Sequence, residues 1–218
     1  MKKNYISELN KKENNTGNIA DAVEEITGFR GWMSSDMKPI YKARIVGRAS
    51  TIKMRPVLNN DKRKYSNYAL EIIDSANSGD ILVYVMEDSL EVAAMGDLMG
   101  TAAKVRGITG AIIDGAVRDI AQLEHLEFPV WSRRVSPATM VGRMVSVEMQ
   151  VPLICAGVLV KPGDYLVCDT DGVVNIPQES IELVLDKLKE YSIKEKKLIT
   201  LIKKEKGIIK AIEKINRY

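Results

Sequence analysis

Two short segments of this 218-residue chain carry charged side chains at a spacing that could serve chemistry. Gly96-Asp97 opens the first segment and Arg118-Asp119 closes the second, with twenty residues between Asp97 and Arg118. One helix and one strand fill a gap of that length, so both segments can reach the same side of an α/β layer. Two carboxylates and a guanidinium gathered there would hold a divalent cation beside a site for an oxyanion.

A simpler structural role is available for each acidic residue. Asp97 stands where a loop is expected to become a helix, so its carboxylate could be an ordinary N-cap. Asp119 could cap the next helix and pair with Arg118 in a surface salt bridge. The backbone N–H groups that begin a helix are also free to bind an anion. These residues alone leave two interpretations open. The aspartates could be helix caps beside a surface salt bridge, or the three side chains could form a shared site for a cation and an anion.

The surrounding sequence predicts the elements that would position these side chains. Helix-like and strand-like patterns alternate, which is typical of a mostly parallel sheet with crossover helices. The expected strands are residues 43–52, 81–85, 110–113 and one that begins at 129, and the expected helices are 68–76, 97–105 and 119–126. We expect the third strand to end near Asp114, where Gly115 allows a sharp turn. Arg118 would then emerge at the carboxyl end of that strand, where open α/β sheets bind ligands.

The flanking segments divide the chain into three parts. Residues 1–15 are rich in Lys and Asn and are expected to be mobile or loosely attached to a domain that spans 16–178. That domain should begin with a helix that has Asn18 as its cap and Gly28 at its end. Residues 179–218 form the third part, in which apolar residues at three-to-four spacing and many lysines predict a long helical extension. This extension would pack along a neighbouring subunit or project as an arm.

Two further features complete the expected order of elements. A polar loop is predicted over residues 55–64. Apolar runs over 165–168 and 173–176 are separated by a turn sequence and predict a β-hairpin. Both features lie outside the two charged segments and bear on the scaffold rather than on the chemistry.

The composition argues against several classes of function. A net charge of +3, with no strongly basic patch before the C-terminal extension, gives no indication of nucleic-acid binding. Cys155 and Cys168 lack the spacing of zinc or redox motifs and are expected to be buried thiols. His125 is the only histidine and is expected at the surface or in packing, so histidine-based triads and zinc sites have no support. No secretory signal or membrane-length apolar run is visible, which predicts a cytoplasmic protein without a membrane partner.

Several motifs resemble those of one protein family. They are Gly96-Asp97-Leu98-Met99, Arg106-Gly107-Ile108-Thr109-Gly110, Asp114-Gly115-Ala116-Val117-Arg118-Asp119, Phe128-Pro129-Val130-Trp131 and Pro162-Gly163-Asp164. Over residues 16–178 the chain is similar to the RraA-like superfamily, which joins the 4-hydroxy-4-methyl-2-oxoglutarate/4-carboxy-4-hydroxy-2-oxoadipate aldolases to the regulators of ribonuclease activity A. The resemblance implies an α/β fold, a swivelling β/β/α domain with a mixed sheet and flanking helices. It also implies a homotrimer or a hexamer, a dimer of trimers, with sites between subunits.

The resemblance implies a metal site with a named ligand set. Asp119 would bind Mg²⁺ or Mn²⁺ directly, and Asp97 would hold the ion through a water molecule. A glutamate from the C-terminal helix of a neighbouring subunit would complete the site, with Glu195 as the first match and Glu190 as the second. This chain keeps both aspartates, whereas regulators in the family commonly lack the acidic residue that follows the arginine.

The implied substrate is a small 2-oxo acid. Arg118 would contact its pyruvyl group, and its carboxylate would meet the backbone at Gly96, Leu98 and Met99. The implied activity is that of a carbon–carbon lyase, a class II pyruvate aldolase that cleaves 4-hydroxy-2-oxo acids through an enolate and also decarboxylates oxaloacetate. The alternative is a non-catalytic regulator that binds a ribonuclease or an RNA-processing complex. A methyltransferase, an older label in this family, is disfavoured because the sequence has no Gly-rich nucleotide loop.

Overall fold

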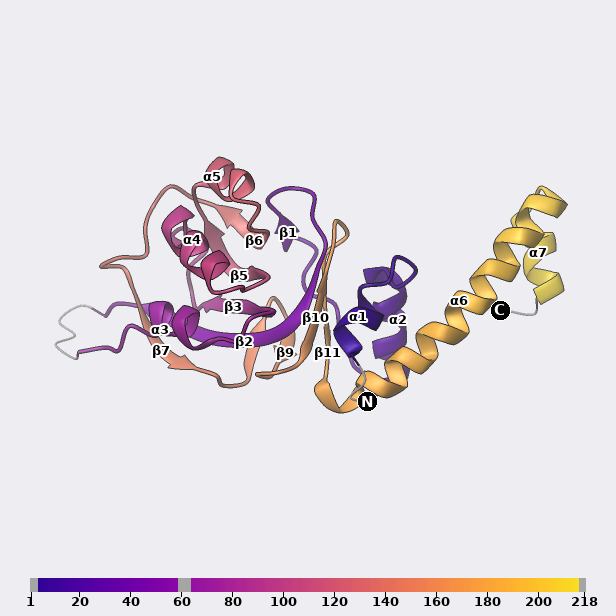
Figure 1. The fold of residues 1–218 in the computed structure, drawn as a ribbon, viewed down its shortest axis with the longest axis horizontal. Coiled ribbons are helices and arrows are strands. Elements are labelled where there is room, and N and C mark those ends of the chain that lie inside the picture. The colour runs from indigo at the N-terminus through magenta and orange to yellow at the C-terminus, as the bar shows by residue number, and fades with distance from the viewer. Residues whose placement is uncertain (1–3, 59–63, 216–218) are drawn as a thin grey trace.

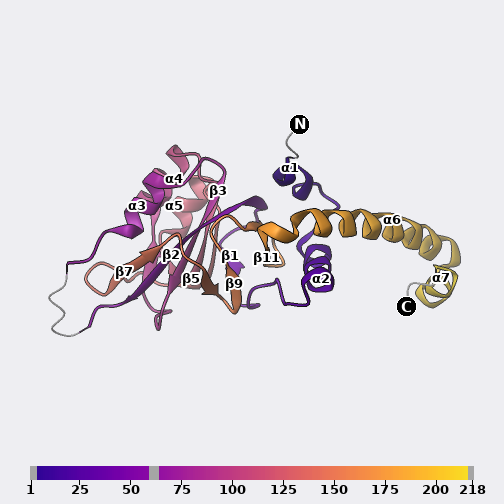
Figure 2. The same ribbon diagram turned by 90° about the horizontal axis from the view of Figure 1, so that it is seen from below.

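The computed structural model describes residues 4–58 and 64–215, and Figures 1 and 2 show its ribbon from two sides. Its helices are α1 (Tyr5–Leu9), α2 (Thr16–Thr27), α3 (Tyr68–Ser75), α4 (Asp97–Val105), α5 (Ile120–His125), η1 (Gln178–Ser180), α6 (Ile181–Glu205) and α7 (Ile208–Ile215). Its strands are β1 (Lys38–Pro39), β2 (Ile45–Pro56), β3 (Asp80–Met86), β4 (Ala93–Met95), β5 (Gly110–Val117), β6 (Val130–Val135), β7 (Met144–Met149), β8 (Leu153–Cys155), β9 (Val158–Val160), β10 (Tyr165–Cys168) and β11 (Val173–Ile176).

Nine strands of the described residues form one mixed sheet. Its order is β1-β6-β5-β3-β2-β10-β11, with β4 beside β5 and β7 beside β2. The central strands β2, β3, β5 and β6 are parallel, whereas β1, β7, β10 and β11 pair antiparallel around them. Parallel neighbours need crossover connections, which α3, α4 and α5 supply. The mixed α/β sheet with flanking helices that the sequence predicts is therefore confirmed.

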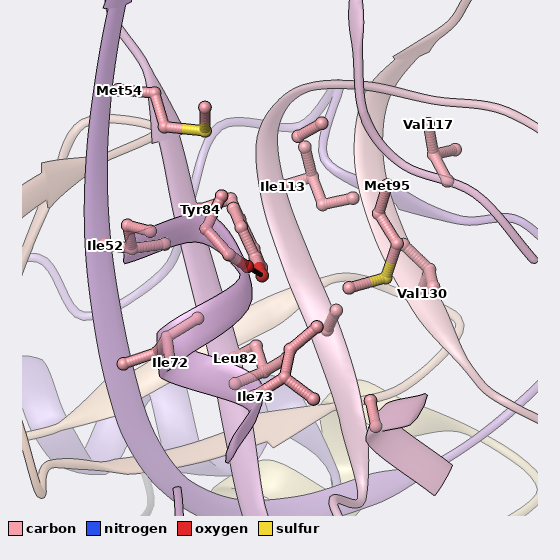
Figure 3. Close-up of a cluster of buried hydrophobic side chains, with 14 of the residues drawn as sticks. Ile52, Met54, Ile72, Ile73, Leu82, Tyr84, Met95, Ile113, Val117 and Val130 are labelled. Atoms are coloured by element: carbon pink, nitrogen blue, oxygen red, sulfur yellow. Dashed lines mark hydrogen bonds between the residues drawn. The ribbon is translucent and has the colours of Figure 1, made fainter. Parts of the chain in front are cut away.

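Both faces of the central sheet are covered. Helices α3, α4 and α5 lie on one face (Figures 1 and 2), and the apolar side chains beneath them surround Tyr84 and Ile113 (Figure 3). Leu82 and Tyr84 point into this cluster, while Val83 on the same strand belongs to the core of the opposite face. The β8–β9 hairpin packs into that second core. Burial on both faces makes the sheet a rigid support for the loops at its edge.

Strand β5 runs farther than the sequence predicts. It continues to Val117 instead of ending near Asp114. Gly115 makes no turn, because it lies within the strand where a Cβ would overlap the side chain of Met86. This glycine allows β5 to pack closely on its neighbour. The chain turns at Asp119 instead, whose φ of 57° lies in the left-handed region.

The N-terminal segment is more ordered than its composition suggests. Within it, α1 docks through the buried side chain of Leu9, which corrects the prediction of a loosely attached N-terminus for this part. Asn15, rather than Asn18, caps α2, because the Asn15 side chain accepts the N–H of Asn18 at 2.8 Å. Gly28 ends α2 in a left-handed conformation, as predicted.

The remaining sequence predictions hold in outline. The hairpin over β10 and β11 is confirmed, and Cys155 and Cys168 are buried free thiols whose pKa burial raises well above the usual value. Strand β2 takes in Arg55 and Pro56, so the predicted polar loop starts later, and its residues 59–63 lie outside the described residues. The C-terminal extension is helical. Figures 1 and 2 show the distal part of α6 and α7 projecting away from the sheet.

No helix within residues 4–58 and 64–215 has the length and apolar character that crossing a membrane requires.

Candidate active site

The site begins at the junction between β4 and α4. Gly96 is the N-cap of α4 and lies buried in an extended conformation. A Cβ on this residue would overlap Oδ2 of Asp119 and would lie 3.0 Å from Nε of Arg118. Only glycine therefore lets the Arg118–Asp119 segment approach the start of α4 this closely. The glycine is the structural reason why two segments that are distant in sequence meet.

Asp119 links the two segments. It occupies the N-cap position of α5 in a left-handed conformation, but its side chain makes no capping bond to α5. Its Oδ2 instead accepts the backbone N–H of Asp97 at 3.2 Å and lies 3.3 Å from Nε of Arg118. Non-glycine residues rarely adopt this conformation, and such strain concentrates at functional sites. The carboxylate thus faces the neighbouring helix instead of its own, which the simple cap interpretation does not explain.

Asp97 is the first residue of α4, because Gly96 holds the cap position. Its Oδ1 accepts the N–H of Leu98 at 2.8 Å, so in this conformation that N–H group already has a partner. The predicted substrate-binding role of the Leu98 N–H therefore requires the Asp97 side chain to turn away. Met99 follows in the same first turn, where backbone N–H groups have no intrahelical acceptor.

Arg118 completes the constellation from the end of β5. Its backbone N–H donates to the carbonyl of Met95 at 3.1 Å, which ties the end of β5 to the end of β4. The side chain is partly exposed. Within residues 4–58 and 64–215, its guanidinium contacts a carboxylate only through Nε. The two terminal nitrogens are therefore available to bind an anion in the bidentate manner typical of arginine.

Asp114 makes structural contacts that the sequence did not predict. Its Oδ1 lies 3.1 Å from Nη1 of Arg133, and its Oδ2 accepts the N–H of Ala156 at 2.6 Å. Arg133 also holds Asp36 at 2.9 Å. Partial burial raises the pKa of Asp36, but hydrogen bonds from Ser34 and Arg133 outweigh that effect, so its pKa lies below the usual range. This network fixes the β8–β9 hairpin to β5 a few residues before the site.

A groove runs from Asp97 between α4 and α5. It has a volume of about 610 Å³ and is open to solvent. Its lining residues are Asp97, Thr101, Lys104, Ala121, Gln122, His125 and Leu126. His125 is the last residue of α5 and shares this groove with Asp97, which composition and spacing alone did not predict. Predicting the position of His125 beside Asp97 would have required knowing that α4 and α5 lie side by side.

The donor set fits a hard divalent cation. Asp97 and Asp119 supply carboxylate oxygens on segments that one hydrogen bond joins. In the described part of the chain, no three His, Cys, Asp or Glu side chains are grouped so that they could hold a metal. Mg²⁺ keeps several water ligands and is usually bound by one or two carboxylates, so two aspartates suit it. A tetrahedral zinc site needs more protein ligands.

The two predicted glutamates lie elsewhere in the same chain. Both are on α6, which Figure 1 shows across the domain from α4 and α5. Glu195 accepts a hydrogen bond from Asn18 at 3.1 Å, and Glu190 pairs with Lys187 at 3.0 Å. The chain therefore brings together Asp97, Arg118 and Asp119 but neither glutamate. A contribution of Glu195 to the site of a neighbouring subunit stays a prediction.

Comparison with known proteins places this chain and its fold in one class, that of RraA-like α/β proteins. The profile of the family described as "RraA-like: Aldolase/RraA" matches residues 16–175. A protein of Halalkalibacterium halodurans named "Putative 4-hydroxy-4-methyl-2-oxoglutarate aldolase" is 33% identical over 173 residues, which cover 79% of this chain and 77% of that protein.

Solved structures agree with this class. An uncharacterized protein from Pseudomonas syringae pv. tomato superposes with a TM-score of 0.82 at 27% identity, covering 95% of this chain and 96% of that one. Streptomyces coelicolor RraAS2, an unusual member of the RNase ES inhibitor RraA protein family, shares the fold with a TM-score of 0.77 at 22% identity, covering 88% of this chain and 93% of that one. The chain belongs to the RraA-like family.

Proposed function

We propose that this protein is a divalent-metal-dependent carbon–carbon lyase that cleaves 4-hydroxy-2-oxo acids and releases pyruvate. The observation that carries the proposal is the convergence of Asp97, Arg118 and Asp119 at the start of α4, with Asp119 turned away from its own helix. The name of the Halalkalibacterium halodurans relative supports this reaction class. The same chemistry would decarboxylate oxaloacetate, because loss of CO₂ from its C4 also leaves the enolate of pyruvate.

Two aspartates would hold the metal ion. Asp119 would bind Mg²⁺ or Mn²⁺ directly, and Asp97 would hold it through water. When bound, such an ion supplies electrostatic stabilisation of negative charge that develops on a substrate oxygen. We also propose that the protein assembles as a homotrimer or hexamer in which Glu195 of a neighbouring copy adds a third carboxylate. Within the described residues, no third side chain of the metal-binding types joins the two aspartates.

The side chains of the site each have a task in the cleavage. The Asp97 carboxylate takes the proton of the 4-hydroxyl group through an intervening water molecule. The C3–C4 bond then breaks, C4 leaves as the carbonyl carbon of the second product, and the electron pair passes to C3 and the 2-oxo oxygen. The terminal nitrogens of Arg118 bind that oxygen as its charge grows, and protonation at C3 gives pyruvate. One well-placed donor of this kind is worth about 10²–10³ in rate.

The test measures pyruvate release from 4-hydroxy-4-methyl-2-oxoglutarate and from oxaloacetate, with Mg²⁺ or Mn²⁺ and with a chelator. We expect turnover that the chelator abolishes and that Asp119→Asn reduces by about 10² or more. Asp74→Asn, which removes an exposed carboxylate on α3, is the matched control and should stay active. An active Asp119→Asn variant would reject the metal assignment. Absence of pyruvate under every condition, together with a stable complex with a ribonuclease, would favour the non-catalytic regulator instead.

A further inference from the structure

A second cavity lies between the start of α2, the loop over residues 30–35 and the turn before β11. It has a volume of about 460 Å³, and Figures 1 and 2 show α2 across the domain from α4 and α5. Among its lining residues, Arg30 supplies a positive charge and Asp171 a negative one. We propose that this cavity binds an α-amino acid with an apolar or aromatic side chain in its zwitterionic form. This site is separate from the proposed lyase centre.

The positive charge of the cavity is held in a fixed position. The guanidinium of Arg30 lies over the Trp32 ring, 5.4 Å from its centroid, and Nε of Arg30 donates to the Trp32 carbonyl at 2.7 Å. These contacts orient the plane of the guanidinium but use neither of its terminal nitrogens. In the described part of the chain, no carboxylate forms an ion pair with Arg30. Both terminal nitrogens can therefore bind the carboxylate of a ligand in the bidentate manner typical of arginine.

The first turn of α2 adds a backbone donor. The N–H of Thr16 donates to Oδ2 of Asp169 at 3.1 Å. The N–H of Asn18 donates to Oδ1 of Asn15 at 2.8 Å. Between them, Gly17 lines the cavity, and its N–H has no acceptor among the described residues. An unpaired N–H group at the positive end of a helix dipole favours an anion, so this group and the guanidinium together form a carboxylate subsite.

The negative charge of the cavity comes from Asp171, in the turn between β10 and β11. Its backbone N–H donates to Oδ1 of Asp169 at 3.0 Å, and its carbonyl accepts Nζ of Lys38 at 3.3 Å. Within residues 4–58 and 64–215, its carboxylate accepts no hydrogen bond and forms no ion pair. This carboxylate would repel a simple anion, whereas it can accept hydrogen bonds from an ammonium group. A ligand that carries both charges on one carbon, as an α-amino acid does, satisfies both ends of the cavity.

Apolar side chains line another part of the cavity. The ring of Trp32 is exposed there, and beside it lie Ala20, Met33, Val173 and Val174. An aromatic surface that is open to a ligand gains most from an apolar or aromatic group, because that contact removes apolar area from water. Ligand sites typically combine such a wall with a few polar groups that fix orientation. The charged groups therefore select the amino-acid head group, and Trp32 selects the side chain.

The first experiment measures binding through the fluorescence of Trp32. The other tryptophan, Trp131, is fully buried, so a ligand in the cavity acts directly on Trp32. The probes are L-phenylalanine, 3-phenylpropionate, which lacks the ammonium group, and phenethylamine, which lacks the carboxylate. L-Phenylalanine should bind with a Kd of about 1 mM or below and about tenfold more tightly than either fragment, as expected for one additional charge-assisted interaction. Equal affinity for the three probes, or no fluorescence change with L-phenylalanine, would overturn the proposal.

The second experiment assigns the two charged groups. Arg30→Met should weaken the binding of L-phenylalanine and 3-phenylpropionate about tenfold and leave phenethylamine within about twofold. Asp171→Asn should weaken L-phenylalanine and phenethylamine and leave 3-phenylpropionate as tight or tighter. The controls Arg143→Met and Asp74→Asn remove exposed charges elsewhere and should change the binding of none of the probes. Equal losses for all three probes in Arg30→Met and in Asp171→Asn would assign both residues a structural role and overturn the proposal.

The same titrations distinguish this cavity from the proposed lyase centre. They are made with a chelator present, because no lining residue of the cavity belongs to the proposed metal site. L-Phenylalanine should bind Asp119→Asn as it binds the wild type and should bind Arg30→Met more weakly. The reverse pattern would place the amino acid beside Arg118 and overturn the proposal. Because none of these readouts requires turnover, a failure of the lyase assay leaves this inference untouched, and a failure here leaves the lyase untouched.

Discussion

Replacement of Gly96 by alanine tests whether the close approach at the start of α4 creates the site. The extended backbone of Gly96 is accessible to alanine, so the substitution adds a methyl group without a conformational penalty. That group would overlap Oδ2 of Asp119 and press on the Arg118 side chain. The Asp119 carboxylate must retreat by about 1 Å to restore ordinary contact, and a misplacement of that size can cost 10²-fold in rate.

The effect on stability should be smaller than the effect on activity. Overpacking of this kind costs about 1–3 kcal/mol, which lowers the Tm of a chain of this size by a few degrees up to about 10 °C. The assay combines kcat for pyruvate release, Mn²⁺ titration and a thermal melt on one preparation. Gly207→Ala between α6 and α7 is the control, since a Cβ there would meet only the Glu205 carbonyl oxygen, at an ordinary contact distance of 3.8 Å. Wild-type turnover in a folded Gly96→Ala protein would refute the reasoning.

Two further predictions concern the scaffold. Tyr84→Phe removes the buried hydrogen bond to the Ala69 carbonyl (2.8 Å) and should lower the free energy of unfolding by about 1–2 kcal/mol in urea without changing the m value. The pKa of Glu25 lies below its ordinary 4.5 because of its hydrogen bond with Lys187, so its stabilising contribution is present above pH 4.5 and lost below it. Thermal melts between about pH 6 and pH 3 should show a weaker acid dependence for Glu25→Gln than for the wild type, whereas Glu24→Gln on the same helix should behave as the wild type.

Local sequence patterns were sufficient to predict much of the scaffold. The predicted helix over 97–105 has the bounds of α4, because a buried strand and Gly96 mark its start and Gly107 follows its end. Strand β5 was underestimated, because a glycine in a strand can serve close packing as well as a turn, and only the Met86 side chain distinguishes the two. The docking of α1 was missed, because one buried leucine is invisible in a segment rich in Lys and Asn.

The sequence predicts which residues form the candidate site but not how these residues are arranged in space. Spacing brings Asp97, Arg118 and Asp119 to one edge of the sheet, and the structure places them there. The left-handed backbone of Asp119 and its bond to the neighbouring helix depend on tertiary contacts that spacing does not encode. The groove beside them was missed for the same reason. Lys104 and His125 lie on different helices, and only the packing of α4 on α5 gives them a common surface.

The binding of Mn²⁺ tests the central claim most directly, because it depends on neither the substrate nor the reaction. Titration of the free ion by electron paramagnetic resonance should give one site per chain in the wild-type protein. Asp119→Asn should lose that site, while Asp74→Asn keeps it and all three proteins show the same thermal melt within a few degrees. Undiminished Mn²⁺ affinity in a folded Asp119→Asn protein would contradict the account.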